Sequence, residues 1–175
     1  NNRNLWLLTL SQVFGSCVAT VNVFISGIIG SQLISIKSLS TLPPALFIVG
    51  TAACTVLASY IMSIFGRKIG FISASIASSL SCFFAAYSIS IESFIFFCIS
   101  CLFMGMGLAF VHQYRFAASE SVEKEKIPKA ISLILLAGIV SAFIGPNIAN
   151  FTKDLIIDKL YVGSYLALSC LVILP

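Results

Sequence analysis

The chain has 175 residues, of which 59% are hydrophobic and only 9% are charged, and its mean hydropathy is +1.07. This composition excludes a soluble domain, which needs more charge to cover its surface. Apolar runs longer than about 18 residues recur along the chain and indicate segments that cross a lipid bilayer. Runs of about twenty residues favour helices, because the strands of a membrane barrel are shorter and alternate between apolar and polar residues.

Six helical segments are expected in chain order, with short polar links between them. The first covers residues 5–30 and the second 42–65, and a tight turn at 66–70 leads to a third that ends near residue 88. The fourth covers 93–116, the fifth 130–151, and the link 152–159 opens the sixth. We therefore predict an all-α, polytopic transmembrane bundle of six spans. Because the chain starts with Asn1 and stops inside an apolar run, residues 1–175 are interpreted as a fragment with a truncated sixth helix.

Basic residues are scattered over the links, which argues against nucleic acid as a partner and informs membrane orientation instead. The links on the side of the N-terminus carry six of them, namely Arg3, Arg67, Lys68, Lys124, Lys126 and Lys129. The opposite side carries Lys37, Lys153 and Lys159. Cytoplasmic links are enriched in Lys and Arg, so we expect the N-terminus in the cytoplasm.

Small residues are dense in the expected helices and predict close approach of helix backbones. The glycines concerned are Gly27, Gly30, Gly105, Gly107 and Gly138. All six cysteines also fall in expected spans, where they act as small apolar side chains. The Cys98 and Cys101 pair has no further ligand nearby, so we expect neither a metal nor another cofactor. Without a catalytic cluster in the sequence, we do not expect an enzyme.

The turn Gly66-Arg67-Lys68 is the most specific local signal, because two long spans joined by so few residues are antiparallel neighbours. Local physics leaves two interpretations open, a positive-inside anchor or a gating element. The turn resembles the loop between helices two and three of the major facilitator superfamily. That pattern begins with a glycine and has an acidic residue three positions before the second glycine, but this chain has Ser59 and Ser63 there.

Two other spans carry partial matches to the same superfamily. In the fourth, Gly105 and Gly107 fit its pattern, whereas Cys101 stands at the position of an arginine tied to proton coupling. In the fifth, Gly145-Pro146 is similar to the centre of an antiporter motif, and the proline predicts a bend. The stretch Tyr114-Arg115-Phe116-Ala117-Ala118-Ser119-Glu120 resembles a bacterial branch of the superfamily without assigned substrates.

This resemblance implies the N-terminal six-helix half of a twelve-helix transporter in the bacterial inner membrane. The expected function is secondary active transport of a small solute by alternating access, with or without a coupling ion. The partners would be the solute, the lipid bilayer and a missing C-terminal half. A non-transporting scaffold subunit of a larger complex is the alternative, since it explains the scarcity of charge within the membrane equally well.

Polar residues inside spans are the candidate solute ligands, because burying them in lipid is costly. The predicted substrate-binding residues are Gln12, Asn22, His112, Gln113 and Arg115. The predicted gating residues are Gly66, Arg67, Lys68, Gly145 and Pro146. These residues also have alternative roles. Gln12 and Asn22 could form hydrogen bonds between helices, and the Arg115 side chain could extend to the membrane interface. Since Ser63 is no acid, we expect Arg67 to find an acidic partner in the missing half.

Overall fold

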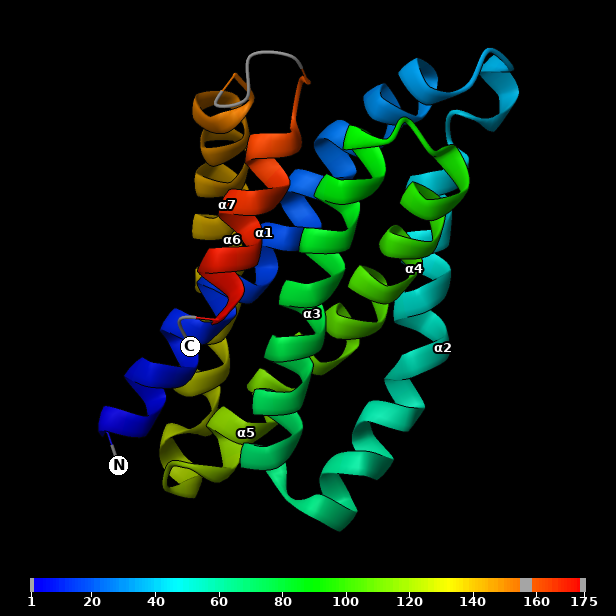
Figure 1. The fold of residues 1–175 in the computed structure, drawn as a ribbon. Coiled ribbons are helices and arrows are strands. Elements are labelled where there is room, and N and C mark those ends of the chain that lie inside the picture. Colours follow the sequence, from blue (N-terminus) through cyan, green and yellow to red (C-terminus); the bar gives the residue numbers. More distant parts are fainter. Residues whose placement is uncertain (1, 155–158, 174–175) are drawn as a thin grey trace.

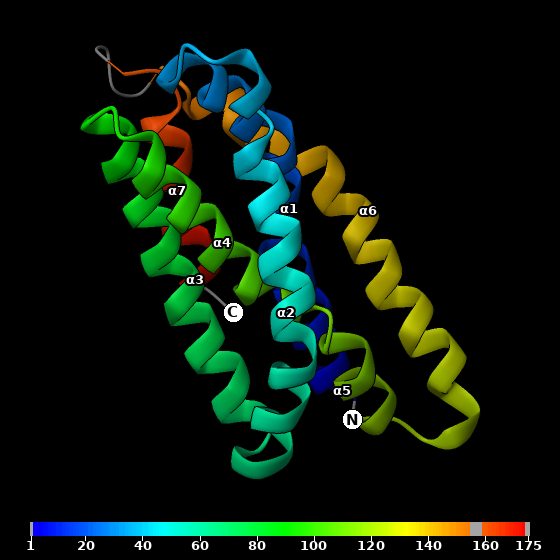
Figure 2. The ribbon, with the colours of Figure 1, turned by 90° about the vertical axis from the view of Figure 1, so that its right-hand side faces the viewer.

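The computed structural model describes residues 2–154 and 159–173, and these form a bundle of helices (Figures 1 and 2). The α-helices are α1 (Asn2–Leu33), α2 (Leu42–Phe65), α3 (Arg67–Ser90), α4 (Phe94–Val111), α5 (Tyr114–Glu120), α6 (Ile127–Thr152) and α7 (Val162–Ile173). Short 3₁₀ helices, η1 (Lys37–Leu39) and η2 (Lys124–Lys126), lie in two of the links. The predicted all-α class is confirmed.

Among the described residues, five segments are long and apolar enough to cross a membrane. They contain α1, α2, α3, the pair α4 and α5, and α6, and the apolar helix α7 is shorter. The chain therefore folds as a helical membrane bundle, as its composition predicts. Part of the expected link before the sixth helix, residues 155–158, lies outside the described residues.

Several helix boundaries differ from the sequence prediction, and three of the differences have a local explanation or consequence. The turn between α2 and α3 is Gly66 alone, with φ +82° and ψ 155°, a conformation that only glycine adopts at little cost. The predicted turn 66–70 was therefore too long, and Gly70 lies inside α3. The fourth span is interrupted at His112 and Gln113, where α4 gives way to α5. Helix α6 starts at Ile127, earlier than predicted. Pro128 fits its first turn, because backbone N–H groups there have no partner within the helix and proline has no N–H.

Helices α2 and α4 pack closely because glycines replace side chains on both sides of the contact. A β-carbon at Gly105 would collide with the carbonyl oxygen of Phe47, and one at Gly50 with that of Leu102. The hydroxyl of Thr51 donates to the Gly105 carbonyl at 3.0 Å. The packing prediction is thus confirmed at Gly105. It is wrong for Gly27 and Gly138, whose β-carbons would meet nothing within 4 Å.

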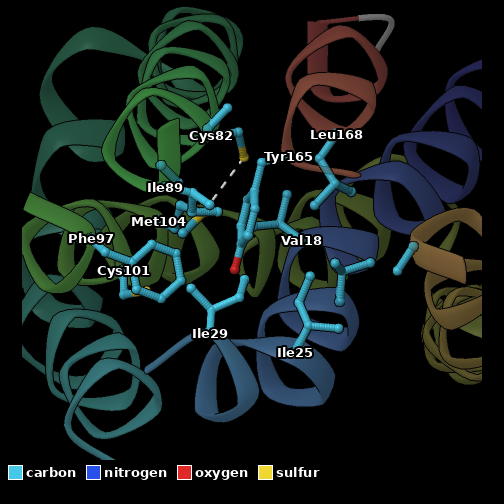
Figure 3. Packing of buried hydrophobic residues seen from close by; sticks show 14 of the residues in the cluster. Val18, Ile25, Ile29, Cys82, Ile89, Phe97, Cys101, Met104, Tyr165 and Leu168 are labelled. Carbon is cyan, nitrogen blue, oxygen red and sulfur yellow. Dashed lines mark hydrogen bonds between the residues drawn. The ribbon is translucent and has the colours of Figure 1, made fainter. Parts of the chain in front are cut away.

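The main core lies where α1, α3, α4 and α7 meet (Figure 3). Tyr165 of α7 is fully buried there and packs edge-to-face on Phe97, with ring centroids 5.8 Å apart. The N-terminus of α1, the α2–α3 turn and α5 gather at one end of the bundle (Figure 1), which we call the Arg67 end. The α3–α4 link and the start of α7 lie at the opposite end, which we call the Glu92 end.

Candidate functional site

An ion pair joins two separate elements at the Arg67 end. Arg67 is the first residue of α3, and its Nε donates to Glu120 Oε2 at 2.7 Å while its Nη2 bonds to the other carboxylate oxygen. Glu120 is the last residue of α5, so this two-point bond fixes the α2–α3 turn against the end of the fourth span. Arg67 thus has an acidic partner within this chain, and a further acidic partner in the missing half stays a prediction.

The same ion pair borders a polar pocket of about 370 Å³. The pocket lies between the last turns of α2 and the joint of α4 and α5, and its lining residues are Ser59, Met62, Ser63, Arg67, Gln113 and Glu120. We call it the α2–α5 pocket. It brings the predicted ligand Gln113 together with the predicted gating residue Arg67.

Asn22 lies deep in the core, away from this pocket. Its side chain is fully buried, and its Oδ1 accepts a hydrogen bond from the Tyr165 hydroxyl at 2.9 Å and from the Cys101 thiol at 3.5 Å. Within the described part of the chain, the Nδ2 of Asn22 has no partner. Asn22 thus connects α1 with α4 and α7, and its predicted contact with a solute stays a prediction.

The other predicted ligands are Gln12 in α1, and His112 and Arg115, which lie close together where α4 gives way to α5. Gln12 is half-buried in α1 and donates to Ser16 Oγ at 2.8 Å. His112 and Arg115 are both exposed, and the guanidinium of Arg115 lies 5.0 Å from the ring centroid of Phe116. Arg115 belongs to α5 and therefore lies at the Arg67 end.

The glycine–proline pair of the fifth span faces α1. A β-carbon at Gly145 would collide with the hydroxyl of Thr20, and that hydroxyl donates to the Ser141 carbonyl at 3.3 Å. Helix α6 continues through Pro146, where the predicted bend stays a prediction. The pair thus lies at the α1–α6 contact, apart from the α2–α5 pocket.

Comparison with curated proteins relates most of the chain to transporters. The riboflavin transporter RfnT of Brucella anthropi is 33% identical over 165 residues, which is 94% of this chain. Two proteins of Bacillus subtilis, the uncharacterized MFS-type transporters YdeG and YddS, are each 25% identical over 87% and 85% of this chain. The chain belongs to the major facilitator superfamily. It spans 42%, 35% and 34% of the length of these relatives, respectively. No family model and no solved structure matches it.

The structure shows where this chain departs from the superfamily pattern of the α2–α3 loop. Ser59 and Ser63, the two departures from that pattern, both line the α2–α5 pocket. Glu120 supplies a carboxylate to Arg67 from another element. The sequence analysis did not identify this partner. Glu120 is the last residue of the family-like stretch that begins at Tyr114, and this position could have indicated it. Tyr165 was also missed, because nothing in an apolar run marks one tyrosine as the partner of Asn22.

Proposed function

We propose that this chain is the N-terminal half of a secondary transporter that moves a small solute across the bacterial inner membrane by alternating access. The observation that carries the proposal is similarity to a named transporter along 94% of the chain. The bundle of five membrane-length segments supports it, since such a half provides one wall of a path between two halves. A scaffold subunit is not favoured, because the relatives are named transporters.

Riboflavin is the solute to test first, because RfnT is named a riboflavin transporter. Riboflavin carries no charge at neutral pH. The chain suits an uncharged solute, since no Asp, Glu, Lys or Arg occurs within residues 4–36, 38–66, 69–91, 93–114 or 130–152. A charged solute would need a counter-charge in the membrane from the remainder of the protein.

The Arg67–Glu120 pair is proposed to act in gating together with Lys68. It holds the start of α3 to the end of α5, so the two elements move as one when the halves rock against each other. Gly145 and Pro146 are proposed to let α6 adjust against α1 during the same motion. With six basic link residues on this side against three on the other, the Arg67 end is proposed to face the cytoplasm.

Five residues are proposed as solute contacts, namely Gln12, Asn22, His112, Gln113 and Arg115. Arg115 discriminates between classes of solute, because its exposed guanidinium attracts an anion from the cytoplasmic side. Arg115→Ala should therefore raise the apparent KM for an anionic solute and leave that for riboflavin unchanged.

The test is uptake by the full-length protein reconstituted in vesicles. We expect saturable riboflavin uptake that excess unlabelled riboflavin abolishes. A full-length sequence with fewer than about ten spans would contradict a two-half transporter, because each half contributes six. Absence of saturable uptake of riboflavin would exclude it as the solute, and a screen of other uncharged solutes would then decide between transport and a scaffold role.

A further inference from the structure

The α2–α5 pocket is lined by the side-chain amide of Gln113. Gln113 is 6% exposed, but its amide atoms are not among the fully buried, unpartnered atoms of the described residues, so they are accessible at the pocket. Its side chain lines the pocket, so its one acceptor and two donors are available there. A ligand or water in the pocket can therefore bond to this amide.

The pocket walls are polar but carry no net charge. Arg67 and Glu120 neutralise each other, and two of the five N–H donors of Arg67 are used in their bond. Ser59 and Ser63 lie one helical turn apart on the same face of α2 and each add a hydroxyl. The Ser63 hydroxyl donates to the Tyr60 carbonyl at 2.7 Å, and its oxygen can still accept.

These groups select an uncharged ligand with hydrogen-bonding groups. An anion would approach the carboxylate of Glu120, whose side chain is 63% exposed, and a cation would approach Arg67. A neutral hydroxyl or amide finds both donors and acceptors among the lining residues. The volume of about 370 Å³ is within the range of small-molecule sites, which is about 300–1,000 Å³.

The two departures from the superfamily pattern strengthen this assignment. A glycine and an acid are expected at positions 59 and 63, and both are serine in this chain. Both changes fall on the wall of one pocket, which Gln113 also lines. They replace one charge by two neutral hydroxyls, which fits a neutral ligand.

We propose that the α2–α5 pocket is a binding site for an uncharged, hydroxyl- or amide-bearing solute at the Arg67 end of the transport path. The proposal rests on the transport function proposed above. The solute occupies this pocket on its way between the centre of the membrane and the aqueous phase. Gln113 and the two serines bond to it, while the Arg67–Glu120 pair forms one wall.

The experiment measures protection of an introduced thiol in the full-length protein. Ser63→Cys is made in a background without reactive cysteines, and its rate of labelling by a maleimide is measured with and without riboflavin as the probe. We expect riboflavin to slow labelling at position 63 by about threefold or more, and Gln113→Leu in the same protein to abolish this protection. Ser132→Cys, at an exposed position near the start of α6, is the matched control and should label at one rate throughout.

A second variant tests the site without relying on Gln113→Leu, which could disturb folding. Ser59 is exposed, so Ser59→Ala leaves the packing intact and should weaken the protection by a few fold. Unchanged labelling at position 63 in the presence of riboflavin would overturn the site. Protection that persists in Gln113→Leu would also overturn it, because the solute would then act from elsewhere. Uptake by the unmodified protein is measured in parallel, and its absence contradicts the transport proposal while the labelling rates still decide the pocket.

Discussion

Each end of the bundle has an ion pair between separate elements, but the two pairs differ in what surrounds them. At the Arg67 end, Arg67 and Glu120 form a two-point bond that borders a polar pocket. At the Glu92 end, Lys159 bonds to one oxygen of Glu92, whose side chain is 71% exposed. The first pair joins two helix ends, and the second joins two links between helices.

The backbone differs in the same way. Among the described residues at the Arg67 end, the one positive φ belongs to Gly66, which adopts it at little cost. At the Glu92 end Glu92 has φ +56° and Tyr161 has φ +68°, and these side chains disfavour such angles. We infer that the Arg67 end is built for a function that involves its pocket, whereas the Glu92 pair tethers links. Both are exposed ion pairs, which are weak by themselves, so the first is expected to matter for transport because of its two-point bond and its place at the pocket.

The largest expected difference between the two ends is their side of the membrane, because labelling from outside should occur at one end and not at the other. In a cysteine-free background, Ser38→Cys should react with a membrane-impermeant maleimide added outside, and Ser121→Cys should not. The physical reason is the excess of basic link residues at the Arg67 end. Labelling with the two positions exchanged would place the Arg67 end outside and contradict the proposed cytoplasmic gate.

The next effect in size concerns the gating pair. Arg67→Gln with Lys68→Gln should impair transport by about tenfold or more while membrane insertion stays intact, because a charge-assisted, two-point bond is lost. Because Arg67 forms this bond, Arg67→Gln alone should account for most of the loss. Initial rates of uptake in vesicles, corrected for the amount of inserted protein, measure this.

Two matched variants control the interpretation. Glu120→Gln should reproduce the loss, and the exchange Arg67→Glu with Glu120→Arg should restore part of the uptake, because the pair is reformed. Lys68→Gln alone should have a small effect. Unchanged uptake in Arg67→Gln would reduce the pair to a topology anchor and remove the contrast with the Glu92 end.

The sequence predicts most of the fold and less of the site, and particular residues show why. Long apolar runs have one stable solution in lipid, so the helices could be placed, and Gly66 marked the turn. The interruption at His112 and Gln113 was missed, because no proline or glycine marks it. The pairing of Arg67 with Glu120 was also missed, since it depends on how α3 and α5 meet and the residues are 53 apart in the chain.

A third and smaller effect is expected midway between the two ends, at Asn22. Asn22→Ala leaves the buried hydroxyl of Tyr165 without its partner, which costs about 1 kcal/mol or more. We expect a lower Tm of the full-length protein and a lower maximal uptake of any solute. Tyr165→Phe removes the same bond and should lower Tm in a similar way. A raised KM in Asn22→Ala would support the proposed contact of Asn22 with the solute, and an unchanged Tm would contradict the structural role of its bond to Tyr165.

The smallest effect is expected at Glu92, where the ion pair stabilises the fold and the positive φ of the backbone destabilises it. The hydrogen bond from Lys159, aided by its positive charge, lowers the pKa of Glu92 below its ordinary value. The contribution of the pair to stability is therefore present at neutral pH and lost as the pH falls through the lowered pKa. Glu92→Gln should lower Tm slightly at neutral pH, and the difference from the unmodified protein should vanish in acid. Uptake should stay within about twofold, as for other surface pairs.

Glu92→Gly separates the two contributions at this end. It removes the ion pair as Glu92→Gln does, but it also relieves the positive φ, so its Tm should lie above that of Glu92→Gln at every pH. Thermal unfolding of the three proteins at neutral and acid pH measures both contributions at once. If Glu92→Gln reduced uptake as strongly as Arg67→Gln, the two ends would act alike. The pair of Glu92 with Lys159 would then belong to a second gate, opposite the first.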